Sequence, residues 1–79
     1  MLEKILDWFP EIKIMKADGF DDAIIGIDID SHRLIYSVSK CIEILEKEMD
    51  NEGAIEYFYY NVKGSDLGEK TPIWCIDTN

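Results

Sequence analysis

The sequence carries little basic charge. Its 79 residues include eight Lys and Arg against 17 Asp and Glu, which gives a formal net charge of −9. Binding to phosphate backbones requires a basic face, so this balance excludes an unaided electrostatic grip on DNA or RNA. We therefore expect no direct binding to nucleic acid.

Cysteines and long apolar runs are also scarce. Two cysteines, Cys41 and Cys75, do not make the framework of a secreted disulfide-rich domain, so we expect two reduced, largely buried thiols. The longest apolar runs are far shorter than the ~20 residues that a membrane span needs. The first residues lack the basic and apolar regions of a signal peptide. We expect an intracellular, soluble protein with no membrane partner.

The length excludes two domains, and it excludes a cofactor-dependent enzyme with its own substrate domain. The chain does have apolar residues, which make up 47% of it, and only two prolines. That is enough apolar surface for a core, which argues against a disordered acidic tail. We expect one small acidic domain over residues 1–79, with no cofactor.

Apolar periodicity predicts an α+β fold with the element order α-β-β-α-α-β. The predicted elements are a helix at 2–9, strands at 23–30 and 33–37, helices at 38–49 and 51–63, and a strand at 73–76. Pro10 ends the first helix, Ser37 or Ser39 caps the second, and Asp50 or Asn51 caps the third. We expect a β-hairpin turning at Ser31 and His32, within a three-stranded, largely antiparallel sheet with the helices packed on one face.

The two later helices are expected to bury apolar stripes. The predicted buried residues are Val38, Cys41, Ile42, Ile44, Leu45 and Met49, then Ile55, Phe58, Tyr59 and Val62. With Phe58 and Tyr59 inward, Tyr57 and Tyr60 share an exposed flank. Tyrosine anchors interfaces because it combines apolar area with a hydroxyl, and it also stacks on nucleobases. The alternative is that Tyr57 and Tyr60 lie at the edge of the core with their hydroxyl groups in water.

Acidic residues are concentrated in two stretches. Asp18, Asp21, Asp22, Asp28 and Asp30 fall within thirteen residues without a Lys or Arg among them. Converging carboxylates bind hard divalent cations, but Arg33 stands where an EF-hand loop starting at Asp28 needs glycine. We expect solvated turn chemistry and no metal. The second stretch, 43–56, presents carboxylates that would compete for the basic groove of a nucleic-acid-binding partner if they are spaced like phosphates.

The sequence predicts no catalytic residue. His32 is the sole histidine, and no nucleophile is placed beside it by spacing, so we expect a polar turn residue and a protein that is not an enzyme. The loop 64–72 lacks the spacing of a phosphate-binding loop and precedes a strand instead of a helix. Its backbone amides and Lys70 can still contact an anion. The candidate partner- or ligand-binding residues are Tyr57, Tyr60, Asp21, Asp22, Glu69 and Lys70.

Three segments together carry a resemblance to a known group of proteins. Residues 18–27 (DGFDDAIIGI), 54–62 (AIEYFYYNV) and 68–73 (GEKTPI) resemble a widespread group of small bacteriophage-encoded proteins that have no settled activity. Members of that group tend to have an aromatic residue where this chain has Asp66. The resemblance implies a phage protein that acts in the cytoplasm of an infected bacterium, and it transfers no site residues.

These observations favour one hypothesis over two alternatives. The first is a non-catalytic phage accessory protein that binds and inhibits a host bacterial protein, such as a defence factor or one that handles nucleic acid. The second is a small-molecule binder that sequesters a nucleotide signal, and the third is a divalent-metal-dependent hydrolase. A chain this short often gains buried area from a second copy, so a homodimer is also open.

Overall fold

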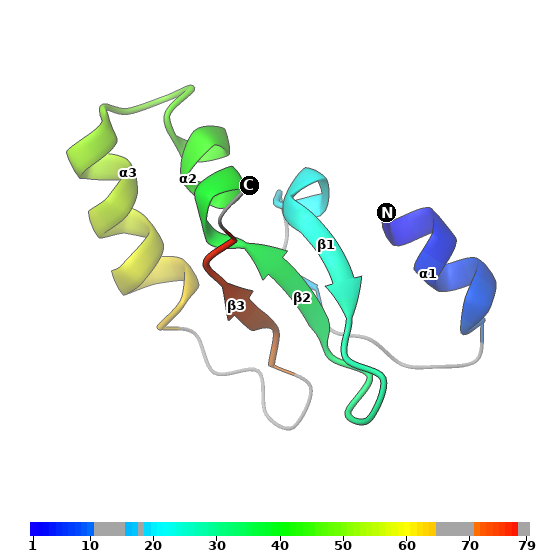
Figure 1. The fold of residues 1–79 in the computed structure, drawn as a ribbon. Coiled ribbons are helices and arrows are strands. Elements are labelled where there is room, and N and C mark those ends of the chain that lie inside the picture. Colours follow the sequence, from blue (N-terminus) through cyan, green and yellow to red (C-terminus); the bar gives the residue numbers. More distant parts are fainter. Residues whose placement is uncertain (11–15, 18, 65–70, 78–79) are drawn as a thin grey trace.

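The computed structural model describes residues 1–10, 16–17, 19–64 and 71–77 of the chain. In chain order the elements are helix α1 (Leu2–Trp8), the 3₁₀ turn η1 (Asp21–Ala23), strands β1 (Ile24–Ile27) and β2 (Leu34–Ser37), helices α2 (Val38–Leu45) and α3 (Asn51–Tyr57), the π-helical segment η2 (Phe58–Val62) and strand β3 (Ile73–Cys75) (Figure 1). The α+β fold and the order of helices and strands predicted from periodicity are confirmed.

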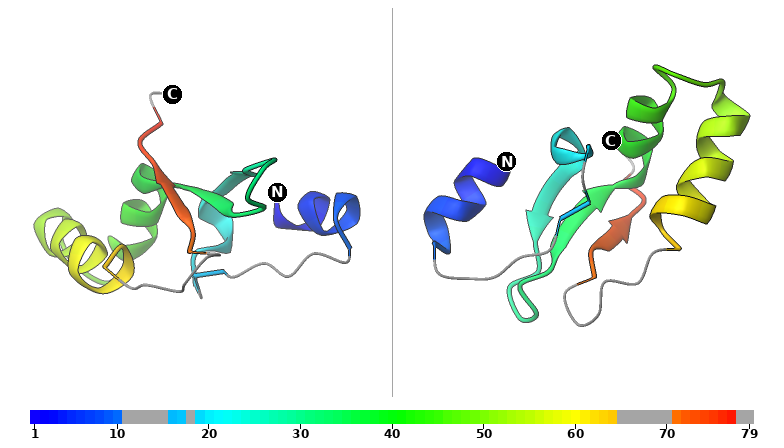
Figure 2. Two further views of the ribbon diagram at one scale, coloured as in Figure 1. Left: turned by 90° about the horizontal axis from the view of Figure 1, so that it is seen from below. Right: turned by 180° about the vertical axis from the view of Figure 1, so that it is seen from behind.

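The three strands form one sheet in the order β1-β2-β3. β1 and β2 pair antiparallel as a hairpin, whereas β2 and β3 pair parallel, so the sheet is mixed. Parallel neighbours need a long crossover connection, and α2, α3 and η2 provide it here. Figures 1 and 2 show α1 beside β1 at one end of the sheet, and the α2–α3 pair at the other end. No helix in the described part of the chain has the length and apolarity to cross a membrane.

The predicted hairpin is present, but its first strand is shorter than expected. β1 ends at Ile27, because the Asp28 carboxylate accepts hydrogen bonds from the Ser31 backbone N–H (2.8 Å) and hydroxyl (2.7 Å) and so starts the turn. Ile29 consequently lies in the turn and is 77% exposed. A bulge between Ile24 and Gly26 alters the face presented by β1, and Ile24 is the strand residue that enters the core.

The core collects side chains from almost every element. Its buried members are Ile5, Phe20, Ala23, Ile24, Leu34, Tyr36, Val38, Cys41 and Phe58. The Tyr36 ring is fully buried, and its hydroxyl accepts a 2.8 Å hydrogen bond from the Ala17 backbone N–H. The Tyr36 hydroxyl therefore connects the segment before η1 to the central strand.

The buried faces of the later helices differ in part from the prediction. α2 buries Val38 and Cys41 as expected, and both cysteines are free, but the helix ends before Met49. In α3 and η2 the inward side chains are Ala54, Phe58 and Val62, a spacing of four residues. The predicted burial of Ile55 and Tyr59 is wrong, since they are 37% and 47% exposed. The buried face passes through Ala54, Phe58 and Val62, and Ile55 and Tyr59 each follow one of these residues, so they lie about 100° further round the helix.

Candidate functional site

Three tyrosines stand exposed along the end of α3 and the start of η2. Tyr57 is 45%, Tyr59 47% and Tyr60 82% exposed. Because Phe58 points into the core, helical geometry places Tyr60 outermost, with Tyr57 and Tyr59 on its two sides. We call these three residues the tyrosine ridge. The expected exposure of Tyr57 and Tyr60 is confirmed, and Tyr59 joins them.

Aromatic contacts connect the tyrosine ridge, through Tyr59, to the sheet. The fully buried Phe58 ring packs edge-on against Trp74 of β3 and against Tyr59, with centroid distances of 5.3 Å and 5.4 Å. Trp74 in turn lies 5.2 Å from the Tyr36 ring. Edge-to-face aromatic pairs of this kind contribute roughly 0.5–1.5 kcal/mol each beyond burial. Within the ridge, Tyr59 is therefore held against the core, which lowers the entropic cost of presenting its ring to a partner.

A π-helical turn lies directly under the ridge. The Lys63 backbone N–H donates to the Phe58 carbonyl across five residues, at 2.8 Å. Such turns are rare and occur frequently at functional sites. Apolar spacing did not predict it, because residues four apart, such as Phe58 and Val62, lie on the same face of a regular α-helix and also of a π turn. Only the backbone hydrogen bond distinguishes the two.

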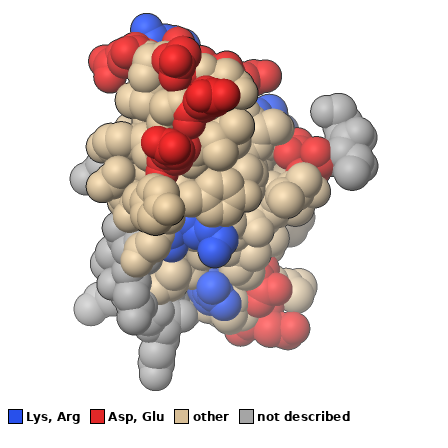
Figure 3. Space-filling view, turned by 90° about the vertical axis from the view of Figure 1, so that its left-hand side faces the viewer, with Lys and Arg blue, Asp and Glu red and all other residues tan. Residues whose placement is uncertain are grey.

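Acidic side chains surround one end of this helix. Five exposed carboxylates lie on the α2–α3 connection and on α3, namely Glu46, Glu48, Asp50, Glu52 and Glu56. Figure 3 shows acidic side chains gathered toward the top of this face, where some basic atoms also lie, and basic side chains below a band without charge. We call these five residues the acidic end. All five belong to the predicted second acidic stretch; Glu52 and Glu56 lie on α3 with Tyr57, and the other three precede that helix.

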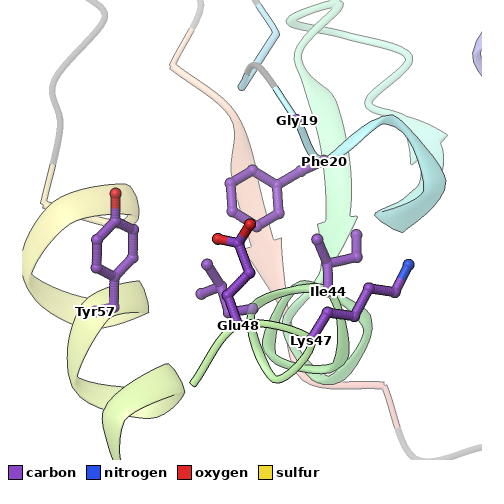
Figure 4. Close-up of a pocket in the computed structure, with 7 residues that line it drawn as sticks. Gly19, Phe20, Ile44, Lys47, Glu48 and Tyr57 are labelled. Atoms are coloured by element: carbon purple, nitrogen blue, oxygen red, sulfur yellow. The ribbon is translucent and has the colours of Figure 1, made fainter. Parts of the chain in front are cut away.

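Tyr57 also borders a hollow of about 380 Å³ between α3, α2 and the segment before η1. Its lining residues are Gly19, Phe20, Ile44, Leu45, Lys47, Glu48 and Tyr57. Figure 4 shows the Glu48 carboxylate next to the Phe20 ring, with the Tyr57 ring on the other side of the gap, while the Lys47 side chain points away from Tyr57. The hollow thus has an apolar floor, an aromatic wall and one carboxylate in its opening. We call it the Tyr57 hollow.

A second hollow of about 220 Å³ adjoins the first along α2. It is lined by Asp22, Lys40, Glu43, Ile44 and Lys47, so the two hollows share Ile44 and Lys47. The structure therefore brings two of the predicted site residues, Asp22 and Tyr57, to neighbouring hollows. Asp22 is placed there because η1 turns the chain against α2.

The other predicted site residues lie elsewhere. Asp21 forms an ion pair with Lys16 at 3.3 Å, with both side chains close to half exposed. Tyr60 lines neither hollow and stands at the crest of the ridge. Glu69 and Lys70 lie outside the described residues. The predicted set is thus divided between the hollows, the ridge and a surface ion pair.

In the described part of the chain, the aspartates of the first acidic stretch do not come together around a common point. Hydrogen bonds from Ser31, the hydroxyl first, lower the pKa of Asp28, whose carboxylate is used within its turn. His32 has a left-handed backbone (φ 58°), and its ring packs 5.6 Å from Phe9. Among the described residues no three His, Cys, Asp or Glu side chains come together to hold a metal ion. Asp18 lies outside that part of the chain.

Sequence patterns did not reveal a polar cluster at the start of α2. The Ser37 hydroxyl donates to Asp77 Oδ1 at 2.6 Å, and the Ser39 hydroxyl donates to the same oxygen at 3.1 Å. Ser37 Oγ also accepts from the Lys40 backbone N–H, which confirms Ser37 as the helix cap. These bonds lower the pKa of Asp77, the Ser37 bond most. The cluster anchors the segment after β3 to the helix, a structural task.

Comparison of the chain with protein-family models, with curated proteins and with solved structures gives no match.

Proposed function

We propose that the protein is a non-catalytic phage accessory protein that binds a basic surface of a host bacterial protein and inhibits it in the host cytoplasm. The observation that carries this proposal is the tyrosine ridge, three exposed tyrosines around the buried Phe58, of which Tyr59 packs against the Phe58 ring. The phage origin and the host partner rest on the resemblance of residues 18–27, 54–62 and 68–73 described above.

The chemistry of the ridge supports a protein partner. Tyrosine is enriched among the few residues that dominate binding energy, because it buries a large area at low entropic cost and keeps a hydroxyl for hydrogen bonding. Tyr60, at 82% exposure, leaves most of its ring in water in the free protein. A partner that covered the Tyr60 ring would bury apolar surface that is exposed to water in the free protein.

The charge of the acidic end supports a basic partner. Five exposed carboxylates beside the ridge, in a chain of net charge −9, repel acidic surfaces and steer basic ones toward the ridge. A protein that handles nucleic acid presents such a basic surface. Occupying it would block access by the nucleic acid, which gives inhibition without catalysis.

The proposal is tested by isolating host proteins that bind the chain and measuring each purified complex by calorimetry. Tyr60→Ala is expected to weaken the complex by roughly 30-fold, the effect of removing an interface hot spot of about 2 kcal/mol. Ile29→Ala, which removes an apolar side chain of similar exposure from the hairpin turn, serves as the control and should leave the affinity unchanged. Raising the salt concentration should slow association.

Two results would overturn the proposal. The first is an affinity that Tyr60→Ala and Tyr59→Ala leave unaltered. The second is a native mass of the free chain showing a homodimer that Tyr60→Ala dissociates, since the ridge would then serve self-association. Measuring the native mass with and without the purified partner separates these outcomes.

A further inference from the structure

We infer that the Tyr57 hollow is a socket for an arginine side chain of the protein partner. This inference rests on the proposed function and adds to it the chemical group that the partner inserts. It depends on the floor of the hollow, on its aromatic wall and on the position of one carboxylate.

The floor and wall of the hollow suit a long side chain with a flat end. Phe20, Ile44 and Leu45 line it with apolar surface, on which the three methylene groups of an arginine can pack. The half-exposed Tyr57 ring borders the opening, and Figure 4 shows it across the gap from Phe20. A guanidinium group stacks on the face of such a ring through a cation–π interaction.

The charge of the residues that line the hollow favours a positively charged side chain as its occupant. Glu48 lines the hollow together with Tyr57 and Phe20, and Figure 4 shows its carboxylate next to the Phe20 ring, whereas the Lys47 ammonium points away. Within the described residues Glu48 has no ion-pair partner, so its charge is available to an incoming cation. The nearby carboxylates of the acidic end strengthen the preference. An anionic ligand such as a nucleotide would meet Glu48 directly and would be repelled.

Arginine fits the gap better than lysine. Its planar guanidinium can pair with both oxygens of a carboxylate and stack on an aromatic ring at the same time. It is also less strongly hydrated than an ammonium group, so it loses less on leaving water. Glu48 and Tyr57 line the same hollow, so both interactions are offered within one opening.

The test uses the full isotope-labelled chain without any partner. NMR resonances of Tyr57, Glu48 and Tyr60 are followed while N-acetyl-arginine amide is added, and the matched neutral probe is N-acetyl-citrulline amide, which has nearly the same shape. The arginine probe is expected to shift Tyr57 and Glu48 saturably and to bind about tenfold more tightly than the citrulline probe, because the ion pair and the cation–π contact are lost with the charge.

Variants assign the effect to the hollow. Glu48→Gln should weaken binding of the arginine probe, but by less than the roughly tenfold difference that separates the two probes, because the cation–π contact with Tyr57 remains. Glu52→Gln is the control, because it removes the same charge from the acidic end but does not line the hollow. Equal binding of the two probes, or equal effects of the two variants, would overturn the socket. Stronger binding of AMP at the same resonances would overturn it in favour of an anionic ligand.

The outcome can be separated from that of the proposed function. The probe experiment contains no partner and reads Tyr57 and Glu48, whereas the complex is tested through Tyr60 and Tyr59. If the socket fails while Tyr60→Ala still weakens the complex, the ridge binds without an inserted arginine. If both fail, the protein-binding proposal fails with the socket.

Discussion

Trp74 stands edge-on to Phe58, with ring centroids 5.3 Å apart and ring planes at 88°. The contact joins the last strand to the π-helical segment that follows α3, two elements separated in the chain by residues 63–72. Trp74 also lies against Tyr36 of the central strand, 5.2 Å away. The exposed tyrosines on the outside of the helix are therefore positioned by a contact on its inside.

Replacing Phe58 should damage the fold far more than replacing its exposed neighbour. Phe58→Ala removes a fully buried ring and leaves a cavity beside Trp74, so we expect a loss of about 3–5 kcal/mol in the free energy of unfolding. Tyr60→Ala, at an 82% exposed position, should cost less than about 0.5 kcal/mol. Urea unfolding followed by far-UV circular dichroism compares them. Similar losses in the two variants would contradict the inward position of Phe58.

The cap of α3 gives a second prediction. The Asp50 carboxylate accepts a 2.7 Å hydrogen bond from the Gly53 backbone N–H at the start of the helix. Asp50→Ala should lower the free energy of unfolding by about 0.5–2 kcal/mol, whereas Asp50→Asn keeps a capping oxygen and should cost much less. Thermal unfolding of the three proteins measures the difference. A loss as large in Asp50→Asn as in Asp50→Ala would show that charge, and not capping, matters at this position.

Acid should destabilise the protein through Asp77 and Asp28. Hydrogen bonds from Ser37 lower the pKa of Asp77 in the folded state, and hydrogen bonds from Ser31 do the same for Asp28. A lowered folded-state pKa means that the stabilisation is complete above the unfolded-state pKa, roughly 4, and is lost as the pH falls through the folded-state value.

Urea unfolding between pH 6 and pH 2.5 measures this acid dependence. Asp77→Asn should be less stable than wild type at pH 6. It should also lose less stability on acidification, because it lacks one of the two carboxyl groups whose pKa is lowered in the folded state. The same slope in wild type and variant would show that the Asp77 contacts with Ser37 and Ser39 do not favour the charged carboxylate.

The two thiols should differ in reactivity. Burial raises the pKa of the Cys41 thiol to about 12, so almost none of it is thiolate at pH 8, and its side chain has no exposed surface. Cys75 is only partly buried. Because the thiolate is the reactive form, a disulfide reagent at pH 8 should label Cys75 first and Cys41 only when the fold opens. Peptide mass spectrometry identifies the labelled site, and faster labelling of Cys41 would contradict its burial.

The sequence by itself determined the local features of this protein. The order of helices and strands, the hairpin, the caps at Ser37 and Asp50, and the acidic surface all depend on residues that are near neighbours in the chain. Turn and capping hydrogen bonds span three or four residues, and apolar periodicity is a property of a single element. For the same reason the exposure of Tyr57 and Tyr60 was correctly predicted.

Only the tertiary structure decided which elements meet. It set β3 parallel to β2, formed a π turn after α3, joined Asp77 to Ser37 by a hydrogen bond, and brought Glu48 to the hollow that Tyr57 and Phe20 also line. Each of these features joins residues from different elements, or depends on a backbone hydrogen bond whose register the packing selects. No local pattern encodes such a contact, because its energy exists only once distant segments have been brought together.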